Sequence, residues 1–301
     1  MADYHVPVML HECMEGLNIK ADGIYVDVTF GGGGHSKEIL KKLGEKGRLL
    51  AFDQDADAQQ NIPSDDRLTF IDQNFRYLKN NCRLHDAPFV DGILADLGVS
   101  SHQFDQPERG FSIRFNADLD MRMDQSSELT AKKVINSYSE ENLHRIFGVY
   151  GEIQNAKTLA RTIVTARLNK PIETVEDLKS AIESLIPKKR ENKYLAQVFQ
   201  ALRIEVNQEL EALEEFLLQS ADILKKGGRL VVMSYHSLED RLVKNFIAKG
   251  KFRGEVEKDF YGNEIKPLLA INRKAITASD EELVSNSRAR SAKLRIAEKI
   301  L

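Results

Sequence analysis

The sequence predicts an α/β fold, a Rossmann-like sheet domain that is interrupted by an inserted all-helical domain. Three observations support this prediction. Short apolar runs alternate with helical segments over roughly the first hundred residues, which is typical of a parallel α/β sheet. Purely helical patterns then occupy residues 106–200. A further apolar run at 230–233 resumes the strand pattern and needs a sheet to join.

The first part of the sheet is predicted to contain four strands, with a helix after the first of them. Each strand is a short, mostly apolar run, and the helix follows four consecutive glycines and ends before Gly44. The predicted strands are 25–30, 48–53, 68–71 and 89–96, and the predicted helix is 36–43.

Helical patterns fill the middle of the chain, where apolar residues recur at the spacing of one helix face. Lys226-Gly227-Gly228-Arg229 is predicted to end the last of these helices, and from Lys266 we expect loops and a basic, helix-like tail. The predicted helical segments are 129–138, 140–147, 153–168, 175–186 and 194–224.

These elements predict a discontinuous sheet domain, residues 1–105 and 201–301, and an inserted helical domain, residues 106–200. Two sequential domains are the alternative. We prefer the insertion because the strand at 230–233 would otherwise have no sheet to join.

The composition is that of a globular chain with enough apolar residues for a core: 42% hydrophobic and 30% charged. The formal net charge is -3, so a nucleic-acid partner would have to be held by local basic patches. The two cysteines, Cys13 and Cys82, are too few for a disulfide framework or a four-cysteine zinc site. The sequence shows no membrane-spanning run, and we expect a cytoplasmic location.

The most informative cluster of residues is the glycine run 31–34 with Asp27 before it and Asp53 after it. Glycines after a first strand let a ligand approach the backbone, and an acid that ends the second strand can bind ribose hydroxyls. A P-loop is excluded because no Gly-Lys-Ser/Thr follows. A dinucleotide fingerprint is disfavoured because Ser36 stands at its third glycine. S-adenosylmethionine fits best, with Asp27 near its methionine part, and a ligand-free tight turn is the alternative.

Asp96 ends the fourth predicted strand. In open α/β sheets, ligands bind at the carboxyl ends of the strands. We therefore expect Asp27, Asp53 and Asp96 to line one crevice.

Nine segments match a known family in order and nearly end to end. They include 27–36 (DVTFGGGGHS), 91–101 (DGILADLGVSS) and 227–240 (GGRLVVMSYHSLED). On these segments the sequence resembles the bacterial 16S ribosomal RNA cytosine-N4 methyltransferases, the RsmH or MraW family. The other matching segments are 5–10, 52–55, 109–112, 119–124, 199–207 and 288–295.

The resemblance implies an S-adenosylmethionine-dependent methyltransferase fold with a helical insertion that recognises the substrate. It also implies methylation of the exocyclic N4 amine of a cytosine, in the decoding centre of 16S ribosomal RNA in the small ribosomal subunit. By similarity, the cofactor contacts fall at Gly33, Gly34, His35, Asp53, Phe75, Asp96 and Gln103. The sequence departs from the family pattern beside the motifs, at His102, Asp118, 194–198 and Ser287.

Three residues are candidates for catalysis. The N4 lone pair of cytosine is delocalised into the ring, so an acceptor at the N4 hydrogens would localise it and take the proton. We expect Asp96, or a backbone carbonyl within 97–99, to be that acceptor. Tyr235 and His236 follow the resumed strand beside Asp240, and a flipped base could stack on Tyr235.

Local basic residues are candidates for binding the RNA. Arg109 lies in the loop before the insertion, and the C-terminal tail and Lys188-Lys189-Arg190 are also basic. The histidines and cysteines lack zinc-ligand spacing, so we predict no catalytic metal. The predicted RNA-binding residues are Arg109, Arg288, Arg290, Lys293 and Arg295.

Two other functions are possible from the sequence. A nicotinamide-dependent oxidoreductase is disfavoured by the missing third glycine. A noncatalytic RNA-binding module would have no need for the three strand-end acids. No obligate protein partner is evident from the sequence, and the oligomeric state is not predicted.

Overall fold

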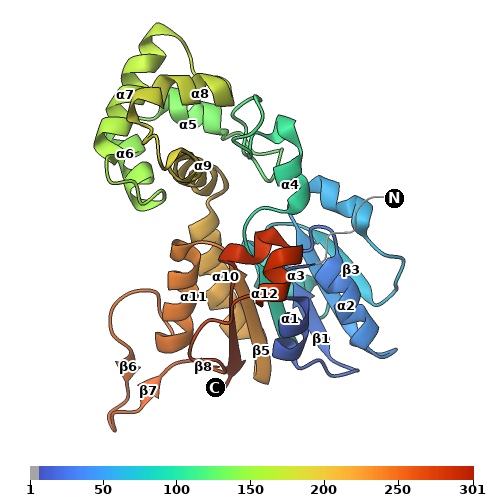
Figure 1. Cartoon of the computed structure of the whole chain (residues 1–301). Coiled ribbons are helices and arrows are strands. Elements are labelled where there is room, and N and C mark those ends of the chain that lie inside the picture. Colours follow the sequence, from blue (N-terminus) through green and yellow to red (C-terminus); the bar gives the residue numbers. More distant parts are fainter. Residues whose placement is uncertain (1–6) are drawn as a thin grey trace. The chain divides into compact units, whose positions relative to one another are not determined.

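The computed structural model describes residues 7–301, and the chain forms two compact units (Figure 1). The first unit comprises Met1–Gly98 and Leu210–Leu301, and the second comprises Val99–Glu209. The predicted insertion, 106–200, lies within the second unit, which starts earlier and ends later than the prediction. His5, in the first matching segment, lies outside the described residues.

A seven-stranded sheet forms the centre of the first unit, in the order β3-β2-β1-β4-β5-β9-β8. The strands from β3 to β5 are parallel, whereas β9 is antiparallel to both of its neighbours. The predicted α/β class is therefore confirmed, and β5 joins the sheet beside β4. The strands are β1 Ile24–Asp27, β2 Arg48–Asp53, β3 Leu68–Asp72, β4 Val90–Asp96, β5 Leu224–Ser234, β8 Leu268–Ala270 and β9 Lys293–Lys299.

Helices cover both faces of this sheet, because successive strand residues point to opposite sides. In β1, Val26 packs into one buried cluster with Phe216, and Tyr25 packs into the other with Ile39. Sheets buried on both faces have nearly continuous apolar strands, as in β2 and β4. The helices of this unit are α1 Leu10–Leu17, α2 Gly34–Lys42, α3 Leu78–Leu84, α10 Glu209–Ile223, α11 Ser237–Lys249 and α12 Asp280–Ser285.

Short elements complete the first unit. A two-stranded hairpin, β6 Glu257–Lys258 and β7 Glu264–Ile265, follows α11. The 3₁₀ turns are η1 Ala56–Asn61, η2 Phe75–Tyr77 and η5 Ser287–Ser291.

The second unit is built from helices, as the sequence predicts. Thr130, Ser139 and Thr174 each cap the start of a helix by accepting a backbone N–H with the side-chain oxygen. Helix α6 packs against α7 and α9. The elements are α4 Ser101–Asp105, η3 Pro107–Arg109, α5 Ala131–Ser137, α6 Glu140–Val149, α7 Ala156–Asn169, α8 Val175–Ile182, η4 Glu183–Leu185 and α9 Glu191–Asn207.

The prediction of one helix over 194–224 is wrong. Gln208 adopts a left-handed conformation with φ of 50°, which ends α9 before α10 begins. Strand β5 already starts at Leu224. The predicted helix stop at 226–229 is instead an irregularity of β5, where the register against β4 shifts between Leu224 and Arg229.

The prediction of a helix-like tail is also wrong. Residues 293–299 form β9, which lies between β5 and β8 in the sheet. Leu294 and Ile296 are buried, while Lys293 and Arg295 alternate with them along the strand. This two-residue period is the strand signal, and the basic composition of the tail hid it.

We expect Leu294→Ala to lower the free energy of unfolding by about 2–5 kcal/mol, because Leu294 is fully buried and the shorter side chain leaves a cavity. Chemical denaturation measures the change. Leu269→Ala on β8 is the matched control, because Leu269 is 47% exposed and its truncation should cost within about 0.5 kcal/mol. Equal effects of the two substitutions would contradict the placement of β9.

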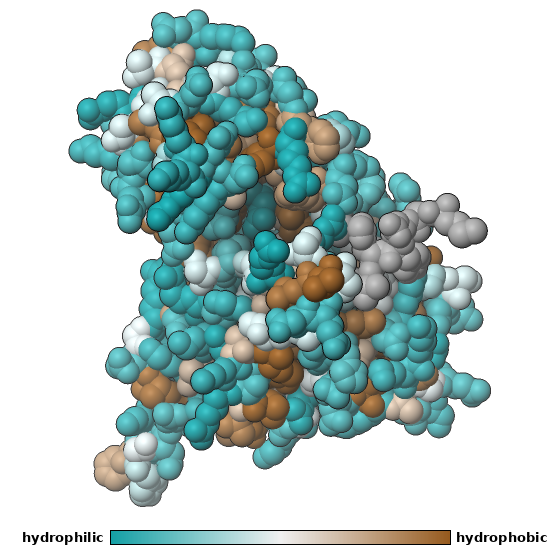
Figure 2. All heavy atoms as spheres, viewed as in Figure 1, coloured by the Kyte–Doolittle hydropathy of each residue, from teal (hydrophilic) through white to brown (hydrophobic). Residues whose placement is uncertain are grey.

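Among the described residues, no helix is long and apolar enough to cross a membrane. Figure 2 shows that hydrophilic residues dominate the visible surface of the chain.

Candidate active site

Three aspartates end three neighbouring strands of the sheet. Asp27 ends β1, Asp53 ends β2 and Asp96 ends β4. Because β2, β1 and β4 are adjacent and parallel, these carboxylates lie at one edge of the sheet. The structure thus brings together the three acids that the sequence singled out.

The glycine loop joins β1 to α2 and is fixed by Asp53. The Gly31 N–H donates to Asp53 Oδ2 at 2.7 Å. Gly33 has φ of +74°, and a Cβ there would lie 2.9 Å from the Phe30 ring. A Cβ at Gly32 would meet nothing within 4 Å, so the loop has open space beside its backbone. This arrangement fits a cofactor that approaches the backbone closely.

Two backbone N–H groups fix the Asp53 carboxylate at the sheet edge. Oδ1 accepts the Asp55 N–H at 2.9 Å, and Oδ2 accepts the Gly31 N–H. Burial raises the pKa of Asp53 to about 6, although the two hydrogen bonds favour the ionised form and oppose this rise. Each oxygen keeps a further lone pair, which is the acceptor pattern that a ribose diol needs.

Asp27 is almost fully buried and accepts hydrogen bonds from residues on either side of the glycine loop. The Ser36 hydroxyl donates to Asp27 Oδ2 at 2.7 Å, and the Thr29 N–H donates to Oδ1 at 3.1 Å. Burial raises the pKa of Asp27. These contacts tie the end of β1 to the first turn of α2, and a direct contact of Asp27 with the cofactor stays a prediction.

Asp96 and Tyr235 are hydrogen-bonded to each other, although 138 residues lie between them in the sequence. The Tyr235 hydroxyl donates to Asp96 Oδ1 at 2.6 Å. The Asp96 N–H donates to Thr29 Oγ1 at 2.7 Å, which ties the end of β4 to the residues after β1. Burial raises the pKa of Asp96 to about 6, and 24% of the side chain is exposed. A ligand can therefore reach this carboxylate.

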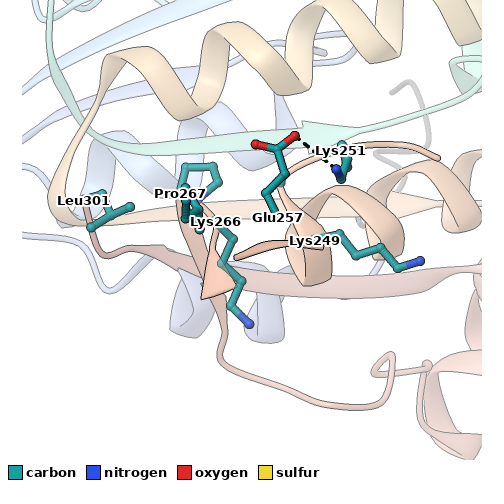
Figure 3. A pocket seen from close by; sticks show the side chains of 8 residues that line it. Lys249, Lys251, Glu257, Lys266, Pro267 and Leu301 are labelled. Atoms are coloured by element: carbon teal, nitrogen blue, oxygen red, sulfur yellow. Dashed lines mark hydrogen bonds and ion pairs between the residues drawn. The ribbon is translucent and has the colours of Figure 1, made fainter. Parts of the chain in front are cut away.

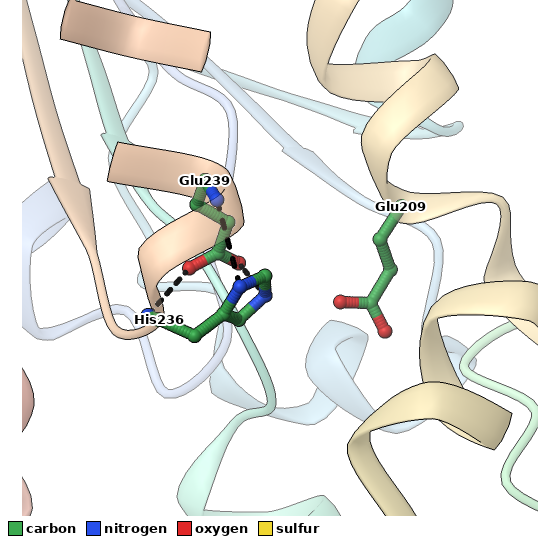
Figure 4. Close-up of side chains that lie close together, drawn as sticks. All are labelled: Glu209, His236 and Glu239. Atoms are coloured by element: carbon green, nitrogen blue, oxygen red, sulfur yellow. Dashed lines mark hydrogen bonds and ion pairs between the residues drawn. The ribbon is translucent and has the colours of Figure 1, made fainter. Parts of the chain in front are cut away.

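His236 caps the start of α11 together with Glu239, a residue that the sequence analysis missed (Figure 4). Glu239 Oε2 accepts the N–H of Tyr235 at 2.9 Å and that of His236 at 3.2 Å. It thereby fixes the turn that carries Tyr235. The sequence does contain one sign of this helix cap, an acid three residues after the capping residue. The usual capping box, however, has Ser or Thr at the capping position instead of His.

Two further cofactor candidates, Phe75 and Gln103, belong to different units. The Phe75 ring packs edge-on against Phe216 at 5.4 Å, in the first unit. Gln103 lies in the second unit, where its side chain accepts the Ser100 N–H and completes a capping box of α4. Their contacts with a cofactor stay predictions.

The basic candidates for RNA binding differ in what they already bind. The buried Arg109 donates to the backbone oxygens of Arg122 and Met123. On β9, Arg295 Nε lies 2.7 Å from Asp240 Oδ1, and Lys293 Nζ lies 3.4 Å from Oδ2 of the same residue.

The other two basic candidates, Arg288 and Arg290, lie on the turn η5. Arg290 is exposed, whereas Arg288 is only partly exposed. RNA contact stays a prediction for all five basic candidates.

A pocket of about 280 Å³ lies away from these residues, between the end of α11, the β6–β7 hairpin and the C-terminal residues (Figure 3). Its lining contains none of the predicted site residues. The residues labelled there are Lys249, Lys251, Glu257, Lys266, Pro267 and Leu301.

A parallel sheet with one antiparallel strand beside β5, a glycine loop after β1 and acids at the ends of β1, β2 and β4 define an S-adenosylmethionine-dependent methyltransferase. Comparison with known proteins agrees. The chain belongs to the MraW methylase family, whose sequence pattern matches residues 2–300. The predicted family and methyl donor are therefore confirmed, and the oxidoreductase alternative is excluded.

Two relatives extend over nearly the whole chain. Ribosomal RNA small subunit methyltransferase H of Flavobacterium johnsoniae is 61% identical over 99% of this chain and 98% of its own length. The protein of the same name from Cytophaga hutchinsonii is 59% identical over 98% and 99%. A solved structure, an rRNA methylase from Streptococcus thermophilus, is 13% identical with a TM-score of 0.39, covering 97% of this chain and 95% of that one.

Proposed function

We propose that this methyltransferase acts on the N4 amine of a cytosine in the decoding centre of 16S ribosomal RNA, within the small ribosomal subunit. The names of the relatives support ribosomal RNA of the small subunit as the substrate. The observation that carries the chemistry is the partly open Asp96 carboxylate, held by Tyr235 at the carboxyl ends of the strands. A cytoplasmic location and the absence of an obligate protein partner stay predictions.

The chain's own residues must align the amine and accept its proton. S-adenosylmethionine supplies an activated methyl group on a sulfonium. As the bond between N4 and the methyl carbon forms, the bond from that carbon to sulfur breaks, and N4 must lose one proton. Asp96 accepts a hydrogen bond from the N4 amine, localises its lone pair and takes that proton. Holding the reactants in line contributes as much as ~7–11 kcal/mol to lowering the barrier.

We assign the cofactor to the glycine loop and Asp53. The open space beside Gly32 admits the methionine part, and the Asp53 carboxylate binds the ribose hydroxyls. Asp27 supports this loop through Ser36 and Thr29. On this proposal the helical unit and the exposed Arg290 contribute to binding the ribosomal subunit.

Methyl transfer from labelled S-adenosylmethionine tests the proposal directly. The substrate is the small ribosomal subunit from cells that lack this modification, with free 16S RNA alongside. Digestion to nucleosides then identifies the product. We expect labelled N4-methylcytidine from subunits. Label in another nucleoside, or none despite measurable cofactor binding, would contradict the proposed substrate.

Turnover should depend on the ionisation of Asp96. Because the pKa of Asp96 is about 6 and the ionised form is the acceptor, we expect kcat to fall as the pH drops below about 6 and to level off above it. The pKa of Asp53 is also about 6, so S-adenosylmethionine must be saturating at every pH. A kcat that is constant between about pH 5 and 7 would contradict the role of Asp96.

A further inference from the structure

Glu239 is a buried acid on the first turn of α11, and the proposed reaction gives it no role. Its Oε2 accepts the backbone N–H of Tyr235 at 2.9 Å. The same oxygen accepts the N–H of His236 at 3.2 Å (Figure 4). A carboxylate that accepts two successive N–H groups fixes the course of the backbone between β5 and α11. The Glu239 side chain is only 4% exposed, so it acts on other protein groups and not on a ligand.

The backbone that Glu239 fixes carries the Tyr235 hydroxyl to Asp96. The hydroxyl donates to Asp96 Oδ1 at 2.6 Å, which is the length of a strong, charge-assisted hydrogen bond. The backbone of Asp96 is anchored separately, because its N–H donates to Thr29 Oγ1 at 2.7 Å. The orientation of the Asp96 carboxylate therefore depends on Tyr235, and that of Tyr235 depends on Glu239.

The second oxygen of Asp96, Oδ2, is left for the substrate. His35 Nδ1 lies 3.8 Å from Oδ2, which is beyond hydrogen-bond distance, and His35 Nε2 lies 3.1 Å from the backbone oxygen of Val8. Within residues 7–301, no group donates a hydrogen bond to Oδ2. With Oδ1 engaged by the tyrosine hydroxyl, an ionised Asp96 offers the lone pairs of Oδ2 to an amine.

We propose that Glu239 is a positioning residue, which fixes Tyr235 so that the tyrosine hydroxyl holds Oδ1 of Asp96 and leaves Oδ2 for the reacting amine. This inference rests on the proposed function for its consequence in catalysis. There, the bond between N4 and its hydrogen breaks as a bond between that hydrogen and Oδ2 forms. Glu239 itself touches neither the substrate nor the cofactor.

The charge of Glu239 and its contacts affect Asp96 in opposite directions. Burial is the main cause of the raised pKa of Asp96; the Tyr235 hydroxyl lowers this pKa, whereas the charge of Glu239 raises it. Loss of the charge alone would therefore lower the pKa of Asp96, and loss of the tyrosine hydrogen bond would raise it. The other titratable groups around Asp96 stay the same in every variant of Glu239 and Tyr235. They are Asp27 on β1, His35 on α2 and Cys13 on α1.

Two substitutions separate the charge of Glu239 from its contacts. In Glu239→Gln, the amide oxygen can still accept both N–H groups, but the charge is gone. In Glu239→Ala, both hydrogen bonds are lost and the turn at Tyr235 is released. Relative to Glu239→Gln, we expect the acid limb of kcat in Glu239→Ala to lie about 1–2 pH units higher, because a hydrogen bond to a charged group contributes that much. At pH values above this limb, kcat should be about 100-fold lower, since misplacement of a reacting group costs that much.

A double variant tests whether Glu239 acts through Tyr235. Tyr235→Phe should also raise the acid limb and lower kcat, because it removes the hydroxyl that holds Asp96. If Glu239 acts through this hydroxyl, Glu239→Ala adds nothing once it is absent, so the double variant should have the kcat of Tyr235→Phe. Losses that multiply in the double variant would reveal independent roles and overturn the inference. An acid limb at the same pH in Glu239→Ala and Glu239→Gln would overturn it as well.

Asp177→Ala is the matched control for the loss of a helix cap. Asp177 has the same place in the capping box of α8, where its Oδ2 accepts the N–H groups of Glu173 and Thr174. Its substitution should leave kcat and the acid limb unchanged. If thermal unfolding shows that Glu239→Ala is not folded, Glu239→Met takes its place in every comparison, because methionine fills similar space without a carboxylate acceptor.

A measurement without substrate separates this inference from the proposed function. NMR of isotope-labelled aspartate follows the titration of the Asp96 carboxyl group in the ligand-free protein, and Asp96→Asn assigns its signal. We expect the pKa of Asp96 to be about 1–2 pH units higher in Glu239→Ala than in Glu239→Gln. Equal pKa values in these variants would overturn the inference even if the enzyme methylates cytosine. The expected difference in a protein that is inactive on subunits would establish the role of Glu239 toward Asp96 and contradict only the proposed substrate.

Discussion

Asp96→Asn should lower kcat by about 10²–10⁴-fold, because the amide cannot take a proton from the reacting amine. The fold should survive the change, since the amide oxygen can still accept the Tyr235 hydroxyl. Single-turnover methyl transfer at saturating cofactor measures the effect.

Stability provides an internal check on this variant. Burial raises the pKa of Asp96 from 3.8 to about 6, so ionisation lowers the stability of the folded protein as the pH rises through that interval. A neutral asparagine avoids this cost, of the order of 3 kcal/mol at most. We therefore expect Asp96→Asn to unfold at neutral pH no more easily than wild type.

The matched control for this variant is Asp91→Asn in the same strand. Asp91 lies near the opposite end of β4 and pairs with Lys225, and its substitution should leave kcat unchanged. If Asp96→Asn instead weakened S-adenosylmethionine binding without lowering kcat at saturation, Asp96 would be a cofactor ligand and not the proton acceptor.

Asp53→Asn should weaken S-adenosylmethionine binding by about 10–100-fold, since hydrogen bonds to charged groups contribute about 1.5–3 kcal/mol. Both carboxylate oxygens accept backbone N–H groups, from Gly31 and Asp55. An amide must place its own NH₂ against one of these donors, so the glycine loop also loses an anchor. Isothermal titration calorimetry measures the affinity.

Asp72→Asn is the control for the effect of Asp53. Asp72 ends the neighbouring strand β3 in register with Asp53, but it is exposed and accepts a hydrogen bond from Gln59. Its substitution should leave cofactor affinity within about twofold. Unchanged affinity in Asp53→Asn would refute the proposed ribose contact.

The parallel strands and their acids could be predicted because each depends on a short stretch of sequence. The runs that became β2 and β4 are apolar throughout, and each ends in its aspartate. Parallel pairing alone then places Asp27, Asp53 and Asp96 at one edge. The glycine loop after β1 was equally local.

The features that could not be predicted depend on distant residues. β9 is a strand because β5 and β8 pair with it on both sides. Buried and more exposed residues alternate over only four of its positions, which is too short a pattern to predict a strand in a basic segment. The break at Gln208 has no glycine or proline to signal it.

The contacts around Asp96 were hidden from the sequence for the same reason. The sequence placed Tyr235 and Asp96 at the same edge of the sheet, but their hydrogen bond depends on the turn that Glu239 fixes. Likewise, the orientation of His35 follows from the path of the chain at Val8.

Because the first unit consists of two separate segments of the chain, its sheet cannot be completed until the second unit has been synthesised. Strand β4 ends at Asp96, and its neighbour β5 begins only at Leu224, after the whole helical unit has been made. At about 5–20 residues per second, a ribosome exposes β4 as an unpaired edge for roughly ten seconds. The helical unit is continuous in sequence and can fold during that interval. The edge of β4 that pairs with β5 therefore stays open during that interval, and the sheet closes beside Asp96 only after the helical unit has been made.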